Sequence, residues 1–118
     1  MTNLLIKIQS TEEWKRGALA ALKAAQKGKT KAEHSVGFPT YSDMHETLAP
    51  SRLEIIKALA GQGPLAIREV ARRVGRDVQA VHRDVTRLIN AGVIERDEKG
   101  VRFDYDGLKF EFKVELAA

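Results

Sequence analysis

The second half of the chain carries the clearest hydrophobic periodicity. Apolar residues recur at helical spacing over 50–60, over 67–74 and from 78 to about 91, with polar residues between them. Gly75 and Gly92 follow the last two segments, where glycine commonly ends a helix. The pattern predicts three successive helices, and the third has a predicted apolar face made of Val78, Val81, Val85, Leu88 and Ile89.

Beyond the third helix the period changes from helical to alternating. Two short strand-like runs, 93–96 and 101–105, flank a turn that ends in glycine, which predicts a β-hairpin. Asp106-Gly107 is a second hairpin signal. Apolar and charged residues then alternate strictly from Leu108 to Leu116, which predicts a strand with one buried face and one wet face.

The first forty residues follow a weaker pattern. Leu4 to Ile8 is predicted as a strand, and the S-x-x-E sequence from Ser10 to Glu13 as the capping box of a helix that runs to about Lys27. Trp14 on that helix is a predicted packing anchor, on this chain or on another. Residues 28–41 lack clear periodicity and are interpreted as a linker or mobile loop. After it, Ser42 is a candidate cap for a short helix through Leu48.

These elements predict an α+β protein in two parts. Residues 1–40 form an N-terminal strand-helix arm and linker, for dimerisation or partner binding, and residues 41–118 form the main domain with a C-terminal β-strand. The two terminal strands have edges that must be paired or protected. We therefore expect them to pair with each other, within a protomer or across a dimer.

Composition excludes several classes of protein. The chain is 43% hydrophobic and 31% charged, which supports a packed core. It has no cysteine, so disulfides, thiol catalysis and zinc fingers are excluded. No apolar run approaches the roughly 20 residues that span a bilayer, and residues 1–4 lack the basic flank and long apolar stretch of a signal peptide. We expect a cytoplasmic protein with no membrane association.

Charge is concentrated in the second and third predicted helices. The chain has 20 Lys and Arg against 16 Asp and Glu, a net charge of +4, which many soluble proteins share. Arginine is the side chain best shaped for bidentate contacts to phosphate and guanine. Charge alone does not separate such a surface from a solvated helical face. The six arginines between Ile67 and Leu88 are Arg68, Arg72, Arg73, Arg76, Arg83 and Arg87.

A framework of three residues favours a helix-turn-helix. Ala71 is small enough for two helices to cross closely, and Gly75 suits a left-handed turn. Val81 then packs a β-branched side chain between the helices. With the following hairpin, this order predicts a winged helix-turn-helix domain, although a three-helix packing without DNA binding would need the same residues.

In that fold the third helix would enter the major groove. Its outward residues are predicted to be Gln79, Ala80, His82, Arg83, Thr86, Arg87 and Asn90. Gln79 is suited to adenine and Arg83 to guanine, and Ala80 allows close approach or contact with a thymine methyl group. Arg76 and Arg87 are better placed for phosphates.

Cations on the neighbouring elements complete the predicted DNA-binding set. Arg68 and Arg72 on the second helix could clamp the flanking backbone. In the hairpin the candidates for the minor groove or for phosphates are Arg96, Lys99 and Arg102. The acidic hairpin tip, Asp97 and Glu98, opposes the charge of DNA.

The segments 63–71, 75–85 and 88–95 resemble winged-helix regulators of the broad MarR and ArsR type. More narrowly, 50–56 and 81–85 resemble small prokaryotic predicted regulators, some of them encoded beside toxin genes. The resemblance covers about 41–115 and implies a dimeric transcription factor or an antitoxin that represses its own operon. The chain departs from metal-sensing ArsR proteins in lacking cysteine clusters, and from MarR proteins in ending with a strand instead of a dimerisation helix.

Catalysis and cofactor binding have little support in the sequence. His34, His45 and His82 are too dispersed for a metal site, and there is no catalytic serine-histidine-acid set or phosphate-binding glycine loop. We expect no enzyme activity and no cofactor. The leading hypothesis is a sequence-specific, dimeric repressor that binds double-stranded DNA in its own operon. The alternative is an antitoxin or protein-interaction module that neutralises a partner toxin; RNA binding is weaker, because few aromatics are available to stack on bases.

Overall fold

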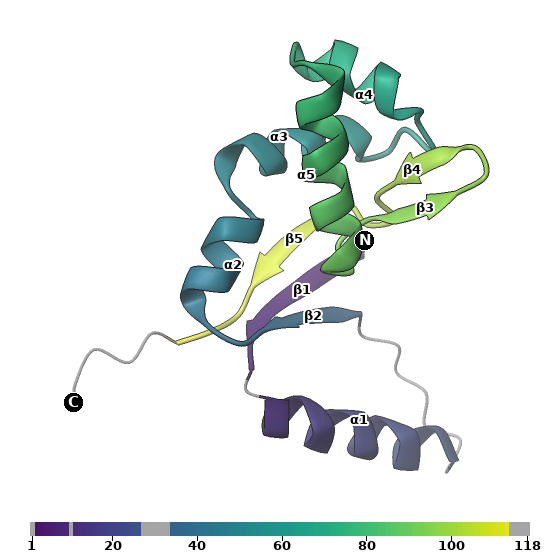
Figure 1. Ribbon diagram of the computed structural model, residues 1–118. Coiled ribbons are helices and arrows are strands. Elements are labelled where there is room, and N and C mark those ends of the chain that lie inside the picture. The colour runs from purple at the N-terminus through teal and green to yellow at the C-terminus, as the bar shows by residue number, and fades with distance from the viewer. Residues whose placement is uncertain (1, 10, 27–33, 114–118) are drawn as a thin grey trace.

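The computed structural model describes residues 2–9, 11–26 and 34–113. It is a mixed α+β fold in which short strands lie at both ends of the chain and most helices lie between them (Figure 1). The helices are α1 (Thr11–Gln26), α2 (Tyr41–Thr47), α3 (Pro50–Leu59), α4 (Ile67–Val74) and α5 (Val78–Asn90). The strands are β1 (Asn3–Ile8), β2 (Ser35–Phe38), β3 (Glu95–Asp97), β4 (Gly100–Arg102) and β5 (Gly107–Phe110).

Three strands form a parallel sheet in the order β2-β1-β5. Its register places Leu4 opposite Leu108, and Ile6 opposite both Val36 and Phe110. The expected pairing of the terminal strands is therefore confirmed, and it occurs within one protomer.

The hairpin predicted at Asp106-Gly107 is wrong. Asp106 is bound instead to the start of the chain, because its backbone N–H donates to the Thr2 carbonyl at 2.7 Å and its carboxylate accepts from the Thr2 N–H at 2.8 Å. These bonds direct β5 alongside β1 and away from β4. β5 ends at Phe110, so the strand is shorter than the predicted alternating segment. Phe110 is also 46% exposed, so the apolar positions do not form the fully buried face that the alternation predicts. Residues 114–118 lie outside the described part.

The segment interpreted as a linker contains a strand. Val36 and Phe38 of β2 are buried against the core, and β1 supplies their hydrogen-bonding partner. Two apolar positions are too few to give a periodic signal, so only the tertiary pairing defines this strand. The following helix α2 is capped by Thr40 and not by Ser42: the Thr40 hydroxyl accepts from the Asp43 N–H at 3.1 Å.

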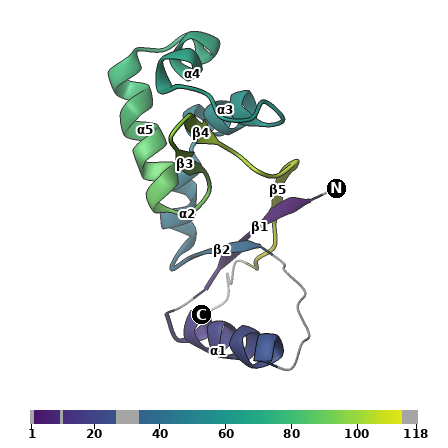
Figure 2. The same ribbon diagram turned by 90° about the vertical axis from the view of Figure 1, so that its right-hand side faces the viewer.

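Helix α1 lies apart from the other helices, with the parallel sheet between them (Figures 1 and 2). Leu19 and Leu22 on this helix are each 58% exposed. The predicted Ser10 cap, the helix end at Lys27 and the side chain of Trp14 lie outside the described part. The predicted helix itself is present.

Helices α3, α4 and α5 share one hydrophobic core with the sheet. Val81, Val85 and Leu88 of α5 are fully buried, as the periodicity predicts. Val78 was expected on the same face but is 44% exposed, because it is the first residue of α5. The other fully buried large side chains are Leu4, Ile6, Ile55, Leu59, Val70, Val93, Ile94 and Val101.

The predicted hairpin between β3 and β4 is confirmed, with Glu95 opposite Arg102. Leu65 and Val101 exchange two backbone hydrogen bonds of 2.8 and 2.9 Å, which attach the hairpin to the segment before α4. At Gly100, φ is 142° and an added Cβ would lie 2.3 Å from the Leu65 carbonyl oxygen. The close approach therefore requires glycine at this position.

Candidate nucleic-acid interface

The turn between α4 and α5 aims the start of α5 away from the core. Gly75 adopts the left-handed conformation with φ 68°, and its N–H bonds back to the end of α4. The Asp77 carboxylate then accepts from the Gln79 and Ala80 N–H groups at 3.1 and 3.2 Å, which caps α5. Ala71 is 2% exposed at the helix crossing. These positions agree with the expected framework.

The outward face of α5 is polar and accessible. Gln79, His82 and Arg83 are exposed, and their side chains have no hydrogen-bonding or ionic partner in the described part of the chain. Ala80 is half-buried between this face and the core. The Thr86 hydroxyl is engaged locally, because it donates to the His82 carbonyl at 2.9 Å.

The arginines of α4 differ in whether their side chains are bound to a carboxylate. Arg68 is exposed and has no partner within the described residues. Arg72 and Arg73 both bond to Glu69, with the Nε of each 3.0 and 2.9 Å from a carboxylate oxygen. The hydrogen bonds from Arg72 and Arg73 lower the pKa of Glu69 to about 2. Glu69 in turn raises the pKa of Arg72.

Two predicted phosphate contacts on or near α5 have acidic partners. Arg76 lies 2.8 Å from Asp84, which is 9% exposed. Arg87 lies 3.3 Å from Glu46 on α2, in a pair that is much more exposed. Arg52 of α3 is the third member of the Asp84 cluster, at 3.1 Å.

Sequence reasoning did not identify the structural part played by Arg52 and Asp84. The available signal was that Asp84 falls three residues after Val81, on the side of the helix that the apolar residues occupy. A charged residue in that position requires a partner, because burial of an unpaired charge is strongly unfavourable. Only the fold shows that Arg52 and Arg76 supply it.

In the hairpin, Arg102 is surrounded by acidic groups. Its guanidinium nitrogens lie 3.0 Å from Asp104, 2.6 Å from Asp97 and 2.5 Å from Glu95. Hydrogen bonds to Asp104 and Asp97, with the charges of Asp104 and Glu95, raise the pKa of Arg102. The pKa of Asp97 is lowered, mainly by the hydrogen bond from the Lys99 N–H at 2.7 Å.

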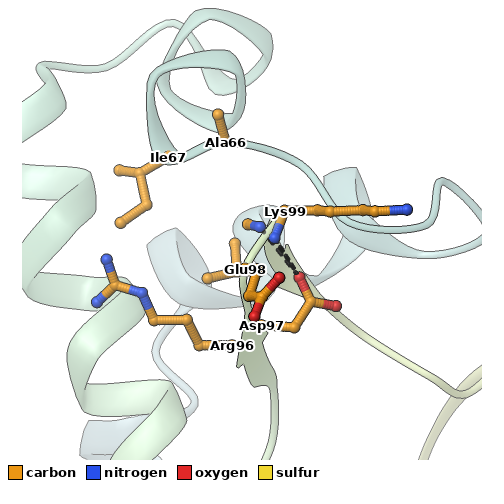
Figure 3. Close-up of a pocket in the computed structure, with 8 residues that line it drawn as sticks. Ala66, Ile67, Arg96, Asp97, Glu98 and Lys99 are labelled. Atoms are coloured by element: carbon orange, nitrogen blue, oxygen red, sulfur yellow. Dashed lines mark hydrogen bonds between the residues drawn. The ribbon is translucent and has the colours of Figure 1, made fainter.

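A shallow groove of about 290 Å³ separates the hairpin from the start of α4. Figure 3 shows Arg96 pointing toward α5, away from the carboxylates of the hairpin turn, whereas Lys99 points to the opposite side. Both side chains are exposed. The groove is lined by Ala66, Ile67, Arg96, Asp97, Glu98, Lys99, Gly100 and Val101.

The predicted cations therefore fall into two groups. Arg72, Arg76, Arg87 and Arg102 have carboxylate partners. The side chains of Arg68, Arg83, Arg96 and Lys99 have none among the described residues. A ligand with distributed negative charge could bind this second group without first breaking an ion pair.

Among residues 2–9, 11–26 and 34–113, no three His, Asp or Glu side chains are grouped so that they could hold a metal ion. In the same ranges, no helix has the length and apolar character needed to cross a bilayer.

Comparison with known proteins assigns the segment that contains α3, α4, α5 and the hairpin to one family. A search of curated proteins finds no match. Residues 47–110 match the model of the HVO_A0114 family. The matched range runs from the end of α2 to β5 and includes α3, α4, α5 and the hairpin, which is more than half of the chain. The chain therefore belongs to the HVO_A0114 family.

Proposed function

We propose that this chain is a winged-helix DNA-binding protein that regulates transcription, with α5 as its recognition helix. The observation that carries the proposal is the division of α5 into two faces. Val81, Val85 and Leu88 are fully buried, while Gln79 and Arg83 are exposed and lie four residues apart on the outer surface. Such a helix can enter the major groove and leave the core intact.

The types of side chain support readout of base edges. Gln79 can form a bidentate pair with adenine, and Arg83 with the O6 and N7 atoms of guanine. Arg83 has no internal partner in the described part, so its guanidinium would not lose an ion pair on binding DNA. Ala80 between them is small enough for the groove floor to approach the helix.

Cations beside α5 would bind the phosphate backbone. Arg68 is exposed on α4, and Arg96 points from the hairpin toward α5 (Figure 3). Phosphate contacts of this kind fix the register of a protein on DNA without reading its sequence. Arg72 and Arg87 could join them, because exposed ion pairs contribute only about 0–1 kcal/mol and are exchanged readily.

The hairpin of β3 and β4 would serve as the wing, and few of its cations are suited to contact DNA. Arg102 is neutralised by three carboxylates, so it is poorly suited to insertion into the minor groove. Lys99 is exposed but follows the acidic Asp97 and Glu98. Arg96 is therefore the hairpin residue that we expect to bind DNA.

We further propose that the protein acts in the cytoplasm as a dimeric repressor of its own operon. A two-fold dimer would place two α5 helices about one DNA turn, ~34 Å, apart on a palindromic site. The proposal of a dimeric repressor has two grounds. It follows from the recognition-helix proposal and from the resemblance to dimeric regulators.

A second candidate function has one observation in its favour. Leu19 and Leu22 of α1 are each 58% exposed, and α1 lies on the side of the sheet away from α5. Exposed leucines on one helix favour contact with a protein partner. An antitoxin would use α1 for its toxin and α5 for its operator, so the two functions are compatible.

The test is binding of the protein to the promoter region of its own gene, compared with an unrelated duplex at several salt concentrations. Arg83→Ala should weaken specific binding by about 1–3 kcal/mol, or roughly 5- to 150-fold, if the contact is bidentate. Binding to the unrelated duplex should change much less. Arg16→Ala removes the same charge from an exposed position on α1 and is the matched control.

Two results would count against the recognition-helix proposal. One is an absence of preference for the promoter over the unrelated duplex in the parent protein. The other is an equal loss of both affinities in Arg83→Ala and Arg16→Ala, because net charge alone would then explain the binding.

A further inference from the structure

Asp84 is an acidic residue on the protected side of α5, held between two arginines. Its Oδ1 atom accepts a hydrogen bond from Arg52 Nε at 3.1 Å, and its Oδ2 atom lies 2.8 Å from Arg76 Nη1. The side chain of Asp84 is only 12% exposed. One carboxylate thus joins α3, the turn before α5 and α5 itself, and the cluster keeps one net positive charge.

Arg76 reaches Asp84 by running alongside the first two turns of α5. It precedes the cap residue Asp77, and Asp84 lies eight positions further along the chain, next to the outward Arg83. Arg76 Nη1 is excluded from solvent, whereas 32% of the side chain remains accessible. Arg76 is therefore fixed at the edge of the surface that would meet DNA.

The contact with Asp84 leaves most donors of Arg76 unused. A guanidinium carries five N–H groups in a rigid plane. Apart from Asp84, no hydrogen bond or ion pair in the described part of the chain involves the Arg76 side chain. Even Nη1 and Oδ2 lack a well-aligned hydrogen bond although they are in contact. A further anion could therefore bind without displacing the carboxylate.

Two other arginine pairs, one between α5 and α2 and one on α4, lack this protection. In the Arg87–Glu46 pair the side chains are 44% and 67% exposed, and in the Arg72–Glu69 pair they are 72% and 33% exposed. Exposed pairs hold side chains only weakly. Arg76 and Asp84, at 32% and 12%, are shielded enough to keep one orientation.

We propose that Asp84 is a positioning residue that orients Arg76 to bind a phosphate of the DNA backbone beside the start of α5. This inference rests on the proposed DNA-binding function. A free arginine side chain loses rotamer entropy when it is fixed, and prior orientation removes part of that cost from binding. Because Asp84 also binds Arg52, it fixes the position of Arg76 relative to α3 as well as relative to the turn before α5.

The first test is Asp84→Asn, with affinity for a duplex of unrelated sequence measured against salt. Loss of one phosphate contact should reduce the slope of log binding constant against log salt concentration by about 0.9 in magnitude. Between ~50 and ~200 mM salt, the fold-loss of affinity in the variant should therefore be about threefold smaller than in the parent. Affinity at low salt should be weaker, although the variant has one negative charge fewer. Glu54→Gln removes the same charge from an exposed site on α3, and neither its slope nor its low-salt affinity should decrease.

Arg76→Ala keeps the test decisive if Asp84→Asn fails to fold, because Asp84 then retains Arg52. The slope should fall by the same ~0.9, and adding Asp84→Asn to Arg76→Ala should not lower it further. Tighter binding by Asp84→Asn, or an unchanged slope in Arg76→Ala, would overturn the positioning role. A parent protein without salt-dependent DNA binding would refute the proposed function itself.

Discussion

Replacing Gly100 with alanine tests how the hairpin is attached to the helices. An alanine Cβ at this position would lie 2.3 Å from the Leu65 carbonyl oxygen and 2.9 Å from the Ala66 nitrogen, both of them backbone atoms that cannot rotate away. The φ of 142° is also strained for any residue with a Cβ. The chain at Leu65 must therefore shift, and its two hydrogen bonds with Val101 are disturbed.

The size of the effect follows from two contributions. A non-glycine residue in this region of φ costs about 1–3 kcal/mol, and each disturbed hydrogen bond costs about 0.5–1.5 kcal/mol. Together these give a loss on the order of 4 kcal/mol in the free energy of unfolding. Gly75→Ala is the matched control, because φ there is 68° but nothing lies within 4 Å of the added Cβ. That change should cost only about 1–2 kcal/mol.

Urea unfolding of the three proteins, followed by circular dichroism, would measure both losses. A Gly100→Ala variant no less stable than Gly75→Ala would show that the contact between Gly100 and Leu65 is not tight in solution. The reasoning on the hairpin would then be wrong.

Two further predictions concern the core and the surface ion pairs. Ile6→Ala should lower the free energy of unfolding by about 2–5 kcal/mol, because Ile6 is fully buried. Leu19→Ala, at an exposed position on α1, should change it by less than about 0.5 kcal/mol. The urea midpoints of the two variants would test this, and equal losses would contradict the position of β1 in the core. The pKa of Glu69 lies at about 2 in the folded chain, against an ordinary 4.5, so its ion pairs stabilise the fold fully above pH 4.5 and lose this contribution as the pH falls toward 2. The stability of Glu69→Gln should therefore fall less than that of the parent across this range in urea titrations, and parallel curves would refute the role of the pairs.

The order of three helices and a hairpin could be predicted from the sequence because those elements carry local signals. Helical spacing from Val81 to Leu88, the cap residue Asp77 and the left-handed Gly75 all depend on residues close together in the chain. The same spacing identified the accessible positions Gln79 and Arg83. Val78 was misassigned, because periodicity cannot show where a helix leaves the core.

The candidate site was only partly predictable, for an electrostatic reason. The sequence contains the arginines, but ion pairing depends on which carboxylates the fold brings near them. Arg102 meets carboxylates across the hairpin, and Arg76 meets Asp84 along α5. Arg83 and Arg96 remain without partners in the described part of the chain, and no local pattern distinguishes them from the other two.

The sequence by itself determined helices α3, α4 and α5, the Gly75 and Asp77 caps between the last two, the hairpin of β3 and β4 and the set of cations, since each depends on local backbone preference or on composition. Only the tertiary structure decided that the sheet is parallel, with β1 between β2 and β5, because strand order and direction depend on contacts between segments far apart in the chain. Strand β2 has too few apolar residues to be recognised alone. Burial of Leu4 and Ile6 among the helices stabilises that pairing, and only the folded core brings those partners together. The same packing brings Arg52 and Arg76 to Asp84, which selects the cations that remain available to a ligand.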